Sequence, residues 1–150
     1  MSQDAVVIVS AARTPMGGMM GSLSDVRAPD LCATSIKAAI ERAGVQAADV
    51  DEVVMGCVLP AGLGQAPARQ ASRAAGIPDA AGATTVNKMC GSGMKAVMMA
   101  HDQIKAGEAE IMVAGGMENM SSVPHYLPGS RLGKKYGNIN MLDGLAFDGL

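Results

Sequence analysis

The sequence predicts an α/β fold, because short apolar runs alternate with segments of helical periodicity. A continuous β-branched run predicts a first strand from Ala5 to Val9, buried on both faces. Further buried strands are expected at Val53 to Leu59, Ala83 to Val86 and Ile111 to Ala114. With 150 residues and 49% apolar content, the chain is long enough to build a substantial core.

Three helices are expected between these strands. Apolar side chains recur at helical spacing from Pro29 to Ala43, and Gly44 follows as a stop signal. A shorter helix begins at Pro67 and ends before Gly76, and a third has helical spacing from Met94 to Lys105. The strands and helices therefore alternate along the first three quarters of the chain.

The periodicity fades after the last strand, where Gly, Pro, Asn, Ser and Met dominate. More than thirty residues without regular pattern are long for a loop inside a compact domain. We therefore expect an α/β core domain over residues 1–116, and over residues 117–150 the start of a loop domain that continues beyond this chain.

Composition and charge exclude several classes of protein. Twelve Lys and Arg face fourteen Asp and Glu, so the net charge of −2 gives no electrostatic case for nucleic acid. Cys32, Cys57 and Cys90 are an odd number without short paired spacing, which argues against a disulfide framework and against a metal site. The sequence has no basic leader and no apolar run of membrane-spanning length, so a cytoplasmic protein without a membrane partner is expected.

Cys90 is the candidate nucleophile. It follows a predicted strand and precedes Gly-Ser-Gly and a helix, and unpaired N–H groups at a helix start favour thiolate over thiol. Gly91 and Gly93 leave room for a substrate to approach the backbone. On these residues alone an inert packing role is equally open, and it is the interpretation for Cys32 and Cys57.

The segment NKMCGSGMKA resembles the region around the acyl-accepting cysteine of thiolases. It is accompanied in order by VVIVSAARTP, GQAPARQA and VAGGMENMS, so the resemblance covers nearly the whole chain. It implies the N-terminal half of the thiolase fold, with a mixed, mainly parallel sheet covered by helices. It also implies that Cys90 forms an acyl-thioester intermediate.

The activity implied by the resemblance is that of an acetyl-CoA acetyltransferase. Cys90 would take an acetyl group from one acetyl-CoA, and a second acetyl-CoA, deprotonated at its α-carbon, would attack it to give acetoacetyl-CoA. The reverse reaction is thiolysis of a 3-ketoacyl-CoA, as in fatty acid metabolism. Coenzyme A thioesters are then substrates, no other cofactor or metal is expected, and the family assembles as homo-dimers or tetramers.

The family takes its catalytic His and a second Cys from C-terminal motifs that this chain lacks, so the 150 residues alone are expected to be inactive. His101 lies about two and a half helical turns beyond Cys90, too far to activate it directly. His125 matches a loop position of the family and is interpreted as structural.

Four further residues are candidate contacts for coenzyme A. The segment Asp148-Gly149-Leu150 resembles the start of a thiolase segment whose Leu packs against coenzyme A. Arg131, Lys134 and Lys135 are close enough in sequence to meet its phosphates, although short basic clusters are usually a solvated surface.

Two other functions stay open at this point. A Cys-dependent thioester hydrolase would pair Cys90 with His125 or His101 and release free acid. A non-catalytic module would only bind a nucleotide or coenzyme A, although the glycine-rich loops lack the G-x-G-x-x-G spacing of a dinucleotide site.

Overall fold

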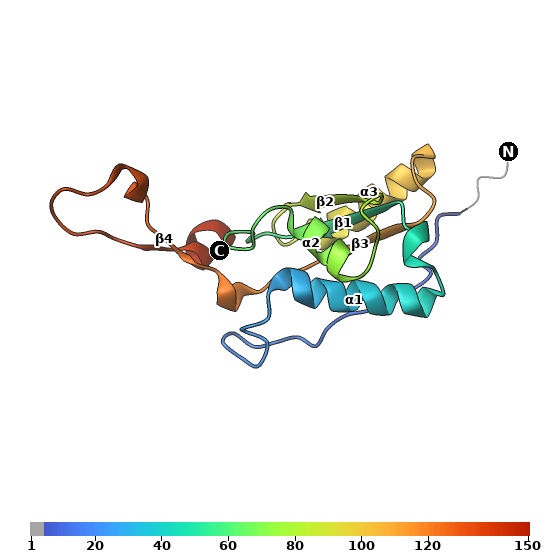
Figure 1. The fold of residues 1–150 in the computed structure, drawn as a ribbon, viewed down its shortest axis with the longest axis horizontal. Helices are drawn as coiled ribbons and strands as arrows, with labels where there is room; N and C mark the ends of the chain where they lie inside the picture. Colours follow the sequence, from blue (N-terminus) through green and yellow to red (C-terminus); the bar gives the residue numbers. More distant parts are fainter. Residues whose placement is uncertain (1–4) are drawn as a thin grey trace.

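The computed structural model of the chain describes residues 5–150, so the first four residues of the predicted core domain lie outside it. Its centre is a parallel sheet in the order β2-β1-β3. The strands are β1 (Glu52–Gly56), β2 (Gly82–Val86) and β3 (Met112–Gly116). The expected α/β fold with a mainly parallel sheet is confirmed, and Figure 1 shows the helices packed around it.

The three expected helices form within a few residues of their predicted bounds. They are α1 (Ala28–Ala43), α2 (Pro67–Ala74) and α3 (Ser92–Ala106). Both long helices end at a glycine in the left-handed conformation, with φ of 68° at Gly44 and 78° at Gly107. These local stop signals explain why the sequence located the helices well.

The sheet lies between two layers of helices, with α1 and α2 on one face and α3 on the other. Val53 and Met55 are buried in a core shared with residues of α1 and α2, namely Cys32, Ala33, Ile36, Ala68 and Ala71. Because side chains alternate along a strand, Val54 and Gly56 face the opposite side, where α3 lies. A Cβ on Gly56 would be 2.6 Å from Ser92 Cβ, so α3 begins in direct contact with the end of β1.

The strand predicted for Ala5 to Val9 is wrong, because no regular strand forms there. Val7, Ile8 and Val9 are exposed by 67, 81 and 69% instead of being buried. A strand needs a neighbour for its hydrogen-bond ladder, and none of the described strands pairs with this segment. It lies across an apolar cavity of about 500 Å³ from β3, whose outer edge is unpaired among residues 5–150.

Within residues 117–150, the segment from His125 to Asp143 leaves the body of the molecule as an arm. Its base is a short antiparallel pair of β4 (His125–Tyr126) and β5 (Leu142–Asp143), and the chain between them projects far from the sheet (Figure 1). The remainder consists of single helical turns and irregular chain, as at Leu145–Gly149. The domain boundary after residue 116 stays a prediction.

Within the part of the chain that the structure describes, no helix combines the length and the apolar character needed to span a membrane.

Candidate active site

Cys90 lies in the tight turn that joins β2 to α3. It is exposed, and it precedes Gly91, the N-cap of α3, directly. The expected position at the start of a helix is therefore confirmed. Met89, just before it, has φ of 49°, which is the left-handed region that residues with a side chain seldom occupy.

Ser92 holds this turn from the helix side. Its Oγ donates to the carbonyl of Met89 at 2.5 Å and accepts from the backbone N–H of Lys88 at 2.9 Å. The side chain is buried against Gly56 of β1. The two bonds tie the backbone before Cys90 to the first residue of α3 after it.

Glu118 and Asn87 hold the turn from the sheet side. Glu118 accepts the backbone N–H groups of Val58 at 2.8 Å and of Leu59 at 3.1 Å. Asn87 donates to the Val58 carbonyl at 3.2 Å and accepts the N–H of Met89 at 3.0 Å. The loop after β1 and the Cys90 turn are thereby tied together.

Asn119 fixes a third segment, the loop that precedes α1. Its Nδ2 contacts the carbonyls of Leu23, Ser24 and Val26 at 3.2, 3.0 and 2.7 Å, and its Oδ1 accepts the N–H of Ser121 at 3.0 Å. Glu118 and Asn119 follow β3 directly, so the end of one strand positions two loops around the cysteine.

These loops enclose an open cavity of about 710 Å³ that Cys90 lines. Its wall includes the glycine-rich loop after Arg13, residues 116–121 and the end of the chain at Gly149 and Leu150. The structure thus brings the predicted coenzyme A contact Leu150, which is 88% exposed, to the same cavity as Cys90.

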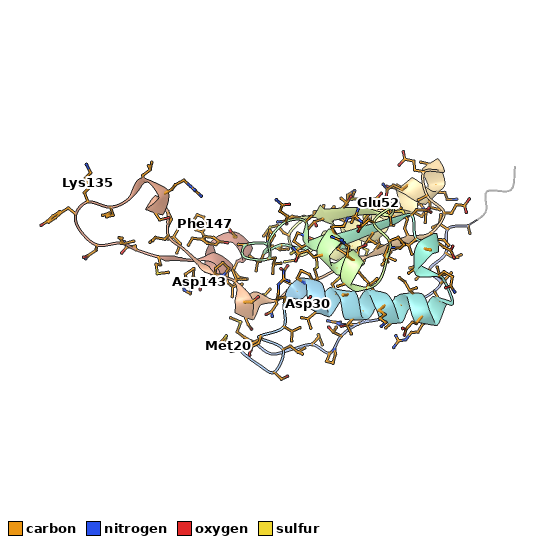
Figure 2. All side chains as sticks on the ribbon, in the orientation of Figure 1. Met20, Asp30, Glu52, Lys135, Asp143 and Phe147 are labelled. Atoms are coloured by element: carbon orange, nitrogen blue, oxygen red, sulfur yellow. The ribbon has the colours of Figure 1, made fainter. Side chains whose placement is uncertain are left out.

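The basic residues Arg131, Lys134 and Lys135 lie elsewhere. None of them lines this cavity, and all three are exposed on the arm. Figure 2 shows Lys135 near the far end of the arm, beyond Asp143 and Phe147 at its base. A contact with coenzyme A phosphates stays a prediction.

Neither histidine reaches the cavity that holds Cys90. His101 is exposed on α3, with its Nδ1 3.1 Å from Asp102 Oδ1. His125 lies in β4, where its backbone is opposite that of Asp143 in β5. Among residues 5–150, the hydrolase alternative therefore lacks an imidazole base beside Cys90.

The other two cysteines have surroundings that suppress thiolate formation. Burial, and to a smaller extent Cys57, raises the pKa of Cys32 to about 12. Burial and then the Glu118 carboxylate, to which the Cys57 thiol donates at 3.7 Å, raise the pKa of Cys57 to about 12. Their interpretation as packing residues agrees with these surroundings.

Residues 5–150 contain no group of three or more His, Cys, Asp or Glu side chains placed to hold a metal ion.

The sequence reasoning did not single out Asn87, Ser92, Glu118 or Asn119. All four lie within two of the motifs quoted above, and three of them follow a strand directly or nearly so. Polar residues just beyond the carboxyl ends of parallel strands were the available signal, because loops that carry function gather at that edge.

Comparison with known proteins shows the family to which the chain belongs. The family model "Thiolase, N-terminal domain" matches residues 6–150. Over 145 residues the chain is 59% identical to an acetyl-CoA acetyltransferase of Cupriavidus necator, 54% to acetyl-CoA acetyltransferase 2 of Arabidopsis thaliana and 52% to a cytosolic acetyl-CoA acetyltransferase of Gibberella zeae.

Each of these alignments covers 97% of the chain but only 36 or 37% of the relative. The chain therefore spans little more than a third of the length of the curated relatives that it matches. Because the family model matches residues 6–150, which are nearly the whole chain, the chain belongs to the thiolase family and corresponds to the N-terminal domain of that family.

Proposed function

We propose that this chain is the nucleophile-bearing part of an acetyl-CoA acetyltransferase, with Cys90 as the acyl-accepting thiol. One observation carries the proposal: Cys90 is an exposed thiol at the start of α3, on the wall of an open cavity. The names of the relatives supply the reaction type and the substrates.

The reaction has two steps. The Cys90 thiolate attacks the carbonyl of acetyl-CoA, a C–S bond forms, and the CoA thiolate leaves, which gives an acetyl thioester on the protein. The α-carbanion of a second acetyl-CoA then attacks that thioester, and the Cys90 thiolate departs from acetoacetyl-CoA. Thiolysis of a 3-ketoacyl-CoA is the same sequence in reverse.

The chain contributes the nucleophile and the walls around it. The start of α3 places backbone N–H groups and the positive end of the helix dipole beside Cys90. In this proposal the base that deprotonates the second acetyl-CoA comes from residues outside the chain, since neither histidine lines the cavity. Leu150 packs against the pantetheine arm of coenzyme A, because it lies on the same wall as Cys90.

Assembly as a homo-oligomer is part of the proposal. The arm carries large apolar side chains in solvent, among them Leu132, Tyr136 and Ile139. Projecting apolar groups of this kind are typical of surfaces that a partner subunit covers. A cytoplasmic location and a role in fatty acid metabolism complete the proposal, and three free cysteines fit a reducing compartment.

The test is the intact mass of the complete subunit after brief exposure to acetyl-CoA or acetoacetyl-CoA. We expect a gain of one acetyl group, and no gain in a Cys90→Ala variant. A Cys32→Ala variant serves as the matched control and should be acetylated normally. A folded, complete subunit that gains no acetyl group would remove the acyl-transfer mechanism.

The same experiment separates the hydrolase alternative. Release of free acetate from acetyl-CoA at the rate of acetyl-enzyme formation, without any CoA acceptor, would identify a hydrolase. Binding of coenzyme A with no acetylation would identify a binding module.

A further inference from the structure

The peptide unit that joins Val58 to Leu59 lies between two side chains that the mechanism has not used. Its N–H, that of Leu59, donates to Glu118 Oε1 at 3.1 Å, and its carbonyl, that of Val58, accepts from Asn87 Nδ2 at 3.2 Å. We infer that Glu118 is a positioning residue for Cys90 and acts through the Val58–Leu59 peptide and Asn87. This inference rests on the proposed function, since it takes Cys90 as the nucleophile.

The position of Glu118 is set by the sheet. The backbone N–H of Met117 donates to the Gly56 carbonyl at 2.9 Å, which extends the pairing of β1 and β3 by one step. Glu118 comes next, and both of its oxygens are used, one by Val58 and the other by Leu59 and the Cys57 thiol. Hydrogen bonds to a carboxylate are stronger than those between neutral groups, so Glu118 anchors the loop after β1 firmly.

The Val58–Leu59 peptide transmits this constraint to Asn87. A peptide group whose N–H, here that of Leu59, is bonded to a carboxylate is polarised, and its carbonyl, here that of Val58, becomes a better acceptor. That carbonyl receives the Asn87 amide. The N–H of Cys57 also donates to the Val86 carbonyl at 3.0 Å, so the pairing of β1 and β2 brings Val58 and Asn87 together.

Asn87 connects the constraint to the nucleophile turn. Its Oδ1 accepts the N–H of Met89, the residue before Cys90, at 3.0 Å. Met89 has φ of 49°, a conformation that persists only where the surroundings impose it. The connection from Glu118 therefore ends on the backbone that sets the direction of the Cys90 thiol.

The helix side of the turn does not depend on Glu118. Ser92 bonds Lys88 and Met89 within the turn itself, and it packs against Gly56. Loss of Glu118 should therefore change the orientation of the turn without dissolving it. Such a change would affect the reacting thiol more than the binding of coenzyme A.

The experiment uses Glu118→Gln in the complete subunit. The variant keeps the shape of the side chain but turns one acceptor oxygen into a donor that faces a backbone N–H. We expect kcat for acetyl transfer to fall about tenfold while KM for acetyl-CoA changes less than about twofold. Glu108→Gln, the same charge change on an exposed residue after α3, is the control and should leave both values unchanged.

A second readout does not require acetyl transfer. The second readout is the rate of Cys90 alkylation by iodoacetamide, measured as a function of pH. In Glu118→Gln the pH at which the rate is half-maximal, the midpoint, should be unchanged, whereas the maximal rate at high pH, the plateau, should be lower. A shifted midpoint with an unchanged plateau would mean that Glu118 acts on Cys90 only through its charge, and it would overturn the inference. Because alkylation is independent of thioester chemistry, this arm stays decisive if the proposed function fails.

The route through Asn87 is tested by a double-mutant cycle. Asn87→Ala should lower the alkylation plateau as Glu118→Gln does, and the double variant should be no slower than Asn87→Ala alone. Additive effects would overturn the route. If Glu118→Gln does not unfold cooperatively, Glu118→Asp, which keeps both oxygens on a shorter stem, is judged by the same criteria.

Discussion

The three cysteines of this chain have the same side chain and different surroundings. Cys90 is exposed at the start of α3, whereas Cys32 and Cys57 are buried between the sheet and α1. Burial raises the pKa of both buried thiols to about 12, so almost no thiolate forms on them near neutral pH.

The first prediction concerns thiol reactivity. Iodoacetamide at neutral pH should label Cys90 in the folded protein and leave Cys32 and Cys57 unmodified, because Cys90 is exposed whereas the other two thiols are buried and have raised pKa values. Peptide mapping by mass spectrometry measures the label on each cysteine. Comparable labelling of Cys32 before unfolding would contradict the assignment.

The second prediction concerns stability at high pH. The pKa of each buried thiol rises from 9.0 to about 12 on folding, so the folded state favours the protonated form. This contribution is complete below pH 9.0 and is lost as pH rises towards about 12. The free energy of unfolding, measured with urea across that range, should fall, and it should fall less steeply in Cys32→Val. A rise with pH would contradict the direction of both shifts.

At the scale of single elements, the contact between β1 and α3 depends on the absence of a side chain at Gly56. A Cβ there would be 2.6 Å from the Ser92 carbonyl carbon and 2.8 Å from Gly93 N, which are backbone atoms that cannot move alone. The start of α3, and with it the Cys90 turn, would have to shift.

The third prediction follows from this contact. Gly56→Ala should lower the free energy of unfolding by roughly 1–3 kcal/mol, as overpacking typically does, and should also slow Cys90 alkylation. Gly115→Ala in β3 is the matched control, since its nearest neighbour is the flexible Met55 Sδ at 3.4 Å. Urea unfolding of both variants makes the comparison, and equal losses would argue against a special contact at Gly56.

The fourth prediction concerns the join between β1 and β3. Asp51 accepts the N–H groups of Glu110 at 2.7 Å and Ile111 at 3.0 Å, and these bonds lower its pKa below the usual 3.8. The stabilisation is present above pH 3.8 and is lost as pH falls through the lowered pKa of the folded state. Asp51→Asn should weaken this acid-dependent loss of stability, as followed by circular dichroism. An identical acid profile in the variant would exclude the role.

The helices could be predicted because their signals are local. Pro29 and Gly44 mark the two ends of α1 within the sequence itself. The segment Ala5 to Val9 has an equally clear β-branched pattern, yet no strand forms, because a strand depends on a partner that the pattern does not contain.

The same distinction applies to the site. The position of Cys90 at the start of α3 could be predicted because the strand, the glycines and the helix around it are neighbours in sequence. The bond from Val58 to Glu118 joins residues 60 positions apart, and that from Asn87 to Val58 spans 29. Such contacts arise from the order of the strands in the sheet, which local patterns do not specify.

At the scale of the whole molecule, much apolar surface stays in solvent. Val7, Ile8 and Val9 are exposed near β3, and the arm adds further apolar side chains at its far end. Most monomeric domains do not carry contiguous apolar surface of this kind uncovered.

The fifth prediction is that residues 1–150, expressed alone, expose apolar surface and do not unfold cooperatively. The fragment should bind a hydrophobic dye such as ANS and unfold over a broad range of urea rather than in one sharp transition. The complete subunit is the comparison, and it should bind little dye. A sharp cooperative transition of a monomeric fragment, verified by sedimentation, would refute this expectation.

Within residues 5–150 the outer edge of β3 has no partner strand, and this has a kinetic consequence. An exposed edge accepts any strand that reaches it, whether from the same polypeptide or from another copy. When the β3 edge pairs with a strand of the same polypeptide, the rate does not depend on protein concentration. When it pairs with a strand of another copy, the rate increases with protein concentration. The amount of chain synthesised at one time, as much as its sequence, thus decides between a folded subunit and an aggregate.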